Sequence, residues 1–543
     1  MDITLILLIS AAVISMAIIP VMMRAAPFLG MIDLPSGRKV HEKPVSRVGG
    51  IGIVVGALLP LLFWIPGDDL LRSFLIGAAV LLLFGAADDA REMGHFVKFI
   101  GQGIAVLTVV FFGDLWVSRF PFFDDPIPAY IGKPFTIFAM IGVINAINHS
   151  DGLDGLAGGE TLLSLIAMVY LSTLSAGDQM VTSIAMVTIG GLFGFLRFNT
   201  HPARVFMGDS GSQFLGFTLA FLAVLLTQRV NTAVSPAVVL LLIGLPIIDI
   251  LTVLFLRVSG GMNWFKATRN HIHHRLLDRG FAHYETVVII YSVQALLVAS
   301  GILLCYAADW LLVALYLAIC FSVLLLLTLG ERSGWKAGQS VVAAPISAAL
   351  GAARESRILR QVPQYLVWVA VPLYFVASAI AIKSVPTDFA VISAGMLLIF
   401  AAAMIFGRSK NSMILRGVVY VCIVFLTYLL TQNQFFGDSL ALQRAEIAFY
   451  TALAIAVGLT IRYSREINFR TTPTDYLVVF IVIAIGVLPG NVFAGNEVAT
   501  GLIKAVILIY SCEVLFLSGV RKWNPLTVAT FFALGSLAAT GLL

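Results

Sequence analysis

Charged residues are scarce in this chain. They make up 12% of its 543 residues, while 59% are hydrophobic; a soluble globular protein carries roughly a quarter of charged residues. This composition excludes a soluble globule. Cysteine is scarce as well, and its four copies form no CxxC pair and fall inside apolar runs: Cys305, Cys320, Cys422 and Cys512. We interpret them as small packing residues and not as redox or metal ligands.

The alternating pattern of a β-barrel and a cleavable signal peptide are both lacking. Apolar runs of about 17–24 residues recur instead, each long enough to cross a bilayer as a helix that satisfies its own backbone. The first run, 3–23, has no basic region before it, and we expect it to stay as a helix. The predicted fold is an all-α polytopic membrane bundle, with about 11 spans followed by about seven more. The predicted spans lie near 3–23, 48–66, 70–87, 97–112, 134–147, 160–175, 180–196, 212–228, 234–256, 284–306, 310–329, 365–384, 388–406, 413–431, 444–461, 474–489, 498–519 and 525–543.

Positive charge is concentrated in alternate loops. The net charge of +5 comes from Lys and Arg beside the predicted spans, so no nucleic-acid partner is needed to explain it. The positive-inside rule places the basic loops in the cytoplasm and the N-terminus outside. Five polar segments then share the cytoplasmic face, as a single site would require: 33–50, 85–102, 145–159, 197–211 and 257–283.

The segment 145–159 is the most polar of the five. It holds Asn145, Asn148, Asp151 and Asp154 together with four glycines, between two apolar runs. A membrane protein avoids such a cluster unless it binds something polar. Glycine lets the backbone approach a ligand, and amide or carboxylate oxygens suit a divalent cation or a nucleobase.

An acid pair, Asp88 and Asp89, ends the third predicted span. Adjacent carboxylates repel each other and need a cation, a proton or a basic ligand nearby; the alternative is a helix that simply ends in water. Lys98 begins the next span and could neutralise a phosphate. A lysine that reaches out to the membrane surface is the alternative for this residue.

Two further segments favour phosphate chemistry. Gly208 to Ser212 precedes an apolar run, which predicts a helix N-terminus suited to phosphate, with Asp209 suited to Mg²⁺; capping alone is the alternative. The other segment holds three histidines beside arginines: His271, His273 and His274. Zinc is disfavoured by the neighbouring cations, so we expect a cationic cradle for a pyrophosphate, against the alternative of a basic surface loop. Together, the segments contain what Mg²⁺-dependent phosphoryl transfer from a nucleotide diphosphate needs.

The order of these motifs resembles the polyprenyl-phosphate N-acetylhexosamine-1-phosphate transferases (glycosyltransferase family 4) of the WecA and MraY type, and the WecA-like branch in particular. The resemblance covers about residues 1–330. It rests on RKVHEKPVSRVGG (38–50), DDAREM (88–93), KFIGQ (98–102), NAINHSDGLDGLAGG (145–159), FNTHPARVFMGDSGS (198–212), PIIDI (246–250) and HIHHRLLDRGF (271–281).

The resemblance implies transfer of an N-acetylhexosamine-1-phosphate, GlcNAc-1-phosphate by preference, from a UDP-sugar to undecaprenyl phosphate with release of UMP. The implied cofactor is Mg²⁺, with Mn²⁺ as a substitute. The implied location is the bacterial inner membrane, and the reaction would start a lipid-linked cell-envelope glycan such as O-antigen. The implied catalytic residues are Asp88 and Asp89, which orient or deprotonate the lipid phosphate, and the implied metal ligands are Asp209 and Asn148. The implied substrate-binding residues are Lys98 for the lipid phosphate, Asp151 and Asp154 for the uracil end, and His271, His273 and His274 for the phosphates or sugar.

The C-terminal part resembles no family that we recognise. We expect a transferase domain at 1–330, a cytoplasmic linker at 331–363 and an additional transmembrane domain at 364–543. The last of these could serve packing or partner binding, dock later glycosyltransferases, or act as a transporter or flippase of lipid-linked sugars. A homodimer of the chain is a further possible assembly. Lys504 and Glu513 share one predicted span, but nine residues place them on opposite helix faces, so we expect no ion pair between them.

Overall fold

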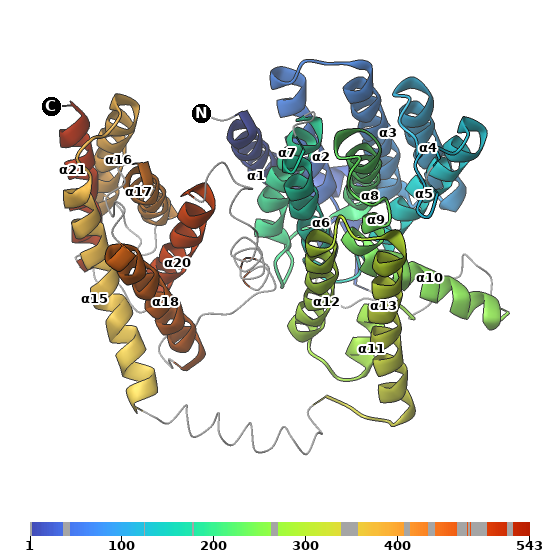
Figure 1. The fold of residues 1–543 in the computed structure, drawn as a ribbon. Coiled ribbons are helices and arrows are strands. Elements are labelled where there is room, and N and C mark those ends of the chain that lie inside the picture. Colours follow the sequence, from blue (N-terminus) through green and yellow to red (C-terminus); the bar gives the residue numbers. More distant parts are fainter. Residues whose placement is uncertain are drawn as a thin grey trace. The chain divides into compact units, whose positions relative to one another are not determined.

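The computed structural model describes residues 3–35, 44–123, 125–175, 179–261, 270–337, 357–406, 413–432, 440–463, 475, 478, 497–517 and 525–542. The chain divides into two compact units (Figure 1). Unit 1 contains residues 1–339 and 472–481, and unit 2 contains residues 340–471 and 482–543. Both consist of long apolar helices, which confirms the predicted all-α polytopic membrane fold.

Within the described ranges, 13 helices are long and apolar enough to cross a membrane, and two shorter apolar helices accompany them. The span predicted at 474–489 lies outside these ranges, apart from residues 475 and 478. The helices of unit 1 are α1 (Ile3–Leu29), α2 (Gly49–Trp64), α3 (Asp69–Arg91), α4 (His95–Leu107), α5 (Ala129–Ser150), α6 (Leu156–Thr173), α7 (Met180–Asn199), α8 (Gly208–Leu225), α9 (Val238–Leu242), α10 (Gly244–Ser259), α11 (Ile272–Asp278), α12 (His283–Leu303) and α13 (Asp309–Arg332); π-helical turns at Thr108–Phe112 and Leu226–Val230 extend α4 and α8.

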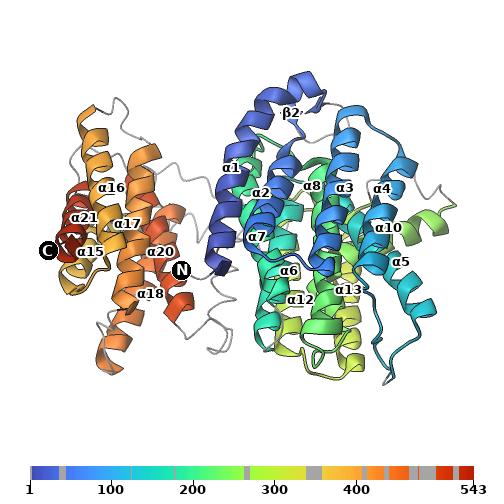
Figure 2. The ribbon, with the colours of Figure 1, turned by 90° about the horizontal axis from the view of Figure 1, so that it is seen from above.

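Helices α6, α7 and α8 are the most buried of unit 1, and α2, α3 and α5 lie around α8 (Figure 2). Aromatic packing joins α3 to α8: the ring of Phe74 stacks on Phe217 with centroids 5.6 Å apart and lies 4.9 Å from Phe221. Such pairs stabilise packing beyond the area that they bury. The bundle therefore holds α8 firmly along its length.

Glycines bring two backbones against the first turn of α8. A Cβ added at Gly50 of α2 would lie 2.2 Å from the backbone nitrogen of Gly211, and one added at Gly85 of α3 would lie 2.4 Å from the Cα of Ser210. Only glycine permits this approach. The start of α8 is thereby fixed in position by α2 and α3 together.

A short strand pair lies beside this helix start. Strand β1 (Ile32–Asp33) pairs antiparallel with β2 (Val45–Ser46), and Ser46 also forms a bridge to Val205. The N–H of Phe206 donates to the carbonyl of Ser46 at 2.8 Å. The segment that leads into α8 is therefore tied to the loop between α1 and α2.

The span expected at 234–256 is not one continuous helix. It divides into α9 and α10, because Pro246 has no N–H to donate to the carbonyl of Leu242. That carbonyl accepts hydrogen bonds from the Ser164 hydroxyl at 2.7 Å and the Gln294 amide at 2.8 Å instead. Side chains of neighbouring helices thus satisfy the backbone group that the break exposes, as a membrane interior requires.

Unit 2 is a second helical bundle with a hydrophobic core of its own. Among the residues described in this unit, two charged pairs each join α20 to a neighbouring helix: Lys504 contacts Glu446 of α18 at 2.6 Å, and Arg416 of α17 contacts Glu513 at 2.8 Å. The expectation that Lys504 and Glu513 do not pair with each other is confirmed. The four cysteines of the chain are all buried, as packing residues should be. The helices of unit 2 are α15 (Arg357–Ala381), α16 (Thr387–Phe406), α17 (Met413–Gln432), α18 (Leu440–Tyr463), α20 (Glu497–Leu517) and α21 (Pro525–Leu542).

Candidate active site

Asp89, at the end of α3, caps the first turn of α8. Its carboxylate accepts the N–H of Asp209 at 2.7 Å, and the N–H and hydroxyl of Ser210 at 3.1 and 2.8 Å. Gly208 is the first residue of this turn and has φ +72°, and a Cβ there would lie 2.6 Å from the carboxylate oxygens of Asp89. A helix N-terminus favours a carboxylate at this place. Asp89 therefore sets the position of Asp209.

Lys98 joins the acid pair of α3 to the first turn of α8. Its Nζ lies 2.9 Å from Oδ2 of Asp88 and also contacts Oδ2 of Asp209. The other oxygen of Asp88, Oδ1, is buried and has no hydrogen-bond partner among the described residues. Carboxylates from two helices thus surround one cation.

Asn148 completes this group from the end of α5. Its amide nitrogen donates to Oδ1 of Asp209 at 3.1 Å and to the hydroxyl of Ser212 at 2.8 Å, and the same side chain carries an amide oxygen. Carboxylate and amide oxygens are the ligands that Mg²⁺ prefers. The donor set fits a divalent cation, and the ammonium of Lys98 already shows that a cation is accommodated beside Asp88 and Asp209.

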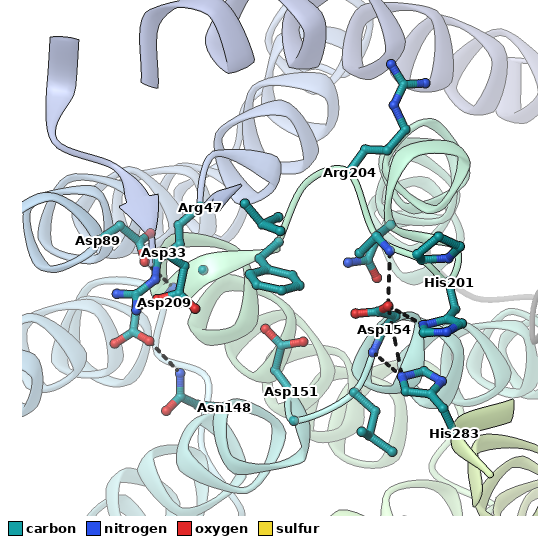
Figure 3. A pocket seen from close by; sticks show the side chains of 18 of the residues that line it. Asp33, Arg47, Asp89, Asn148, Asp151, Asp154, His201, Arg204, Asp209 and His283 are labelled. Atoms are coloured by element: carbon teal, nitrogen blue, oxygen red, sulfur yellow. Dashed lines mark hydrogen bonds and ion pairs between the residues drawn. The ribbon is translucent and has the colours of Figure 1, made fainter. Parts of the chain in front are cut away.

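A cavity of about 850 Å³ opens beside these residues (Figure 3). Asp89, Asn148 and Asp209 lie at one end of it, and Asp151 lies between the two ends. Burial raises the pKa of the Asp151 carboxyl to about 7, and the carboxylates of Asp209, Asp89 and Asp154 add to the shift. Several carboxyl groups therefore lie close together in this part of the cavity, and their repulsion favours a cation or a proton among them.

Asp154 occupies the opposite end of the cavity. Its Oδ2 accepts a hydrogen bond from Nδ1 of His201 at 2.7 Å and from the N–H of Ala203 at 3.0 Å. The backbone N–H of Asp154 donates to Nε2 of His283 at 3.2 Å, and the two imidazoles stack with centroids 4.0 Å apart. One ligand atom from each of these three side chains lies within 4.8 Å of the others. Because hydrogen bonds already occupy the atoms concerned, we interpret the group as a rigid hydrogen-bonding wall.

The three histidines of the fifth polar segment do not face the cavity equally. His274 lines it, whereas His271 and His273 are buried and are not part of the lining. Nδ1 of His271 donates to Asp249 at 2.7 Å, and Asp249 also accepts the N–H of Ile272 at 2.7 Å, so it caps α11. Burial, together with the smaller effect of the neighbouring His274, lowers the pKa of His273 to about 3. His273 is therefore neutral near pH 7 and supplies no positive charge to a phosphate.

Direct contacts join five of the sequence-predicted site residues, and the cavity lining adds three more. The five in contact are Asp88, Asp89, Lys98, Asn148 and Asp209. The three further lining residues are Asp151, Asp154 and His274. Their individual roles in catalysis, metal binding and substrate binding stay predictions.

Several lining residues received no role from the sequence: Asp33, Arg47, Asn199, His201, Arg204 and His283. Arg47 pairs with Asp33, and although burial opposes it, the charge of Asp33 raises the pKa of the guanidinium above its usual value. Arg47 was indistinguishable from ordinary positive-inside charge, because its use depends on a strand pair that apolar periodicity does not reveal. His201 and His283 stood inside polar segments, but only the fold brings them to Asp154.

Comparison with known proteins identifies the family of this chain. The model of the family "Glycosyl transferase family 4" matches residues 71–227, which include both acid-rich helix ends of the site. The chain is 33% identical over 296 residues to a probable undecaprenyl-phosphate N-acetylglucosaminyl 1-phosphate transferase of Bacillus subtilis, covering 54% of this chain and 82% of that protein. It is 30% identical over 295 residues to the undecaprenyl-phosphate alpha-N-acetylglucosaminyl 1-phosphate transferase of Escherichia coli K12, covering 52% of this chain and 79% of that protein. The motif order, the membrane bundle and these relatives together show that the chain belongs to glycosyl transferase family 4, the polyprenyl-phosphate N-acetylhexosamine-1-phosphate transferases of the WecA and MraY type.

Proposed function

We propose that this chain transfers GlcNAc-1-phosphate from UDP-GlcNAc to undecaprenyl phosphate. An oxygen of the lipid phosphate attacks the β-phosphorus of the donor. The bond between that phosphorus and the bridging oxygen breaks, and UMP leaves with the bridging oxygen. The product is undecaprenyl diphosphate-GlcNAc, which starts a lipid-linked cell-envelope glycan. The observation that carries the proposal is the cluster of Asp89, Asn148 and Asp209 at one end of the cavity in a chain of this family.

The cavity offers each part of the donor a chemically suitable place. The donor pyrophosphate would lie near Asp209 and Asn148, and its uridine would extend toward Asp154, which His201 and Ala203 hold in one orientation. Arg204 and His274 also line the cavity and can donate hydrogen bonds to phosphate or sugar oxygens. Asp151 lies between the two ends, near the point where the reacting phosphates would meet.

The acceptor would enter from the side of Lys98. This residue is not part of the cavity lining, and its own helix α4 carries exposed apolar side chains beside it: Phe96, Phe99 and Ile100. An apolar flank suits a polyprenyl chain, and an ammonium suits its phosphate. Because the lipid phosphate is largely ionised near pH 7, the attack does not depend on a general base.

Asp209 and Asn148 would hold Mg²⁺, for which Mn²⁺ could substitute. Bound there, the cation neutralises charge that develops on the phosphates in the transition state. Asp89 keeps Asp209 in place through the cap of α8, and Asp88 restrains Lys98. We propose that this site lies on the cytoplasmic face of the bacterial inner membrane, with the N-terminus outside; the basic loops support this through the positive-inside rule.

The first experiment is a transfer assay in detergent with undecaprenyl phosphate, Mg²⁺ and three donors: UDP-GlcNAc, UDP-GalNAc and UDP-MurNAc-pentapeptide. UMP release from UDP-GlcNAc alone, dependent on both the lipid and the cation, is the expected result. Release from UDP-GalNAc alone would overturn the choice of sugar. No release from any donor, with folded protein, would overturn the proposed reaction.

Unit 2 favours a second, separate task, because its core is independent of unit 1. We propose that unit 2 either docks later glycosyltransferases or transports the lipid-linked product across the membrane. A second copy of the chain is another candidate partner. The two charged pairs on α20 are consistent with either task, since ionisable side chains inside a membrane bundle are costly and usually serve a function.

A further inference from the structure

The ammonium of Lys98 lies between the carboxylates of Asp88 and Asp209, where a divalent cation could also bind. Its Nζ contacts one carboxylate oxygen of Asp88 and one of Asp209, and Asn148 binds the other oxygen of Asp209. We propose that Lys98 is an exchangeable counter-ion. It neutralises these carboxylates while the substrates are absent and moves to the phosphate of the polyprenyl acceptor when that lipid binds. The carboxylates are then released for the divalent cation, so lipid binding and metal binding reinforce each other. This inference rests on the proposed function.

Competition between the ammonium and a divalent cation follows from their shared ligands. Lys98 already contacts Oδ2 of Asp209, so a metal ion held by this carboxylate would lie close to the ammonium, and two neighbouring cations repel each other in a partly buried site. Metal binding without lipid must therefore displace Lys98 from Asp209 or proceed without that oxygen. Either course lowers the affinity for the metal.

Lys98 also has a place to move to. Lys98 belongs to the first turn of α4, and its flexible side chain is 26% exposed. The cap residue before this helix is Gly94, which makes no side-chain cap hydrogen bond. A lipid phosphate arriving along the apolar flank of Phe96 and Ile100 would meet both the ammonium and the positive end of the helix. The acceptor phosphate can thus replace two carboxylates as the partner of Lys98.

The alternative is a permanent ion pair that only ties α4 to α3 and α8. Such a lysine would stabilise the bundle, but it would not respond to the acceptor lipid. A thermodynamic cycle separates the two cases, because coupling between two ligands is reciprocal and is measured by binding alone.

The test is a titration of Mn²⁺ into the full-length protein in detergent, with free Mn²⁺ measured by electron paramagnetic resonance. No donor is present, so no turnover occurs. We expect Lys98→Met to bind Mn²⁺ about tenfold more tightly than wild type in the absence of lipid. Undecaprenyl phosphate should raise the Mn²⁺ affinity of wild type by about the same factor, and that of Lys98→Met much less.

Lys133→Met is the matched control, since Lys133 also begins a membrane helix and pairs with an aspartate, Asp114, at 3.1 Å. It should behave as wild type. Lys98→Arg keeps the positive charge, so its Mn²⁺ affinity should stay weak without lipid and rise with undecaprenyl phosphate. This second variant keeps the proposal testable if Lys98→Met fails to fold. Equal Mn²⁺ affinity of wild type and folded Lys98→Met, or equal lipid effects in both, would overturn the proposal.

A second ligand arm identifies the anion that draws Lys98 away. UDP in place of undecaprenyl phosphate should leave the difference between wild type and Lys98→Met unchanged. If UDP and not the lipid removes that difference, Lys98 exchanges with the donor pyrophosphate and the assignment to the acceptor is wrong. Failure of the proposed reaction itself would show separately, as absence of UMP release from the wild-type protein.

Discussion

At the residue scale, the candidate site converges on Asp209. Lys98, Asn148 and Gln213 all contact its carboxylate. Asp209→Asn keeps the shape but removes the charge, so we expect the rate of UMP release to fall roughly 10²–10³-fold, the usual loss for one group that stabilises transition-state charge. The thermal unfolding temperature should change little. Asp114→Asn, at an exposed aspartate that pairs with Lys133, is the control and should retain activity. Full activity of Asp209→Asn would remove Asp209 from the metal site.

The raised pKa of Asp151 predicts a pH-dependent penalty on folding. Its pKa is about 7 in the folded protein, against an ordinary value of 3.8. The folded state therefore holds this proton more tightly than the unfolded state, and stability is lost as the pH rises from 3.8 through 7. Without divalent cations, Asp151→Asn should melt at a higher temperature than wild type at pH 8 and at nearly the same temperature at pH 4. Thermal unfolding in detergent with a chelator measures both. If Asp151→Asn raised the melting temperature equally at both pH values, the charge of Asp151 would not be the cause of the stabilisation.

At the element scale, carboxylates from neighbouring helices fix two helix starts. Asp89 caps α8 and Asp249 caps α11. The sequence revealed the acid pair and the helix start after Met207 as separate signals, because each is local. It could not reveal that one caps the other, because residues 120 apart meet only through the packing of α3 and α8. The same limit explains the break between α9 and α10, where apolar periodicity continues across a proline.

The charged pairs of unit 2 provide a prediction about helix packing. Arg416→Leu would leave Glu513 without its cation, so we expect it to lower the free energy of unfolding by about 1–3 kcal/mol, less than a fully buried pair because both side chains are about a quarter exposed. Arg416→Leu combined with Glu513→Leu should recover most of this loss. Thermal unfolding of the full chain measures the effect.

The control for this cycle is Arg72→Leu, which breaks an exposed pair with Asp69 and should cost less than about 0.5 kcal/mol. A double variant as unstable as Arg416→Leu alone would mean that Arg416 stabilises α17 by another contact. The cation–π approach of Arg416 to Phe516, at 5.3 Å, is the contact that such a result would implicate.

At the scale of the whole molecule, the sequence indicated the membrane class, the family and most of the residues that meet at the acidic end of the cavity. Long apolar runs and polar motifs are local signals, so they are readable without the fold. The cavity wall made by His201 and His283 is not local, since its residues come from different loops and helices. The task of unit 2 is not readable either, because its sequence consists of apolar spans with few polar side chains to carry a chemical signature.

The two-unit organisation predicts that transfer and glycan output can be separated. A chain that ends after Gln339 lacks residues 472–481 of unit 1, but it keeps two bonds near its new end: Arg275 to Glu331 at 2.7 Å, and the N–H of Ala337 to the carbonyl of Arg279 at 2.8 Å. We expect this shortened protein to release UMP in detergent at close to the wild-type rate, because the cavity lining lies wholly in unit 1. In cells that lack the full-length chain, we expect it to restore the lipid-linked sugar but not the finished glycan. Loss of UMP release from folded shortened protein would instead make unit 2 part of the catalytic machinery, and normal glycan output would remove docking and translocation as its task.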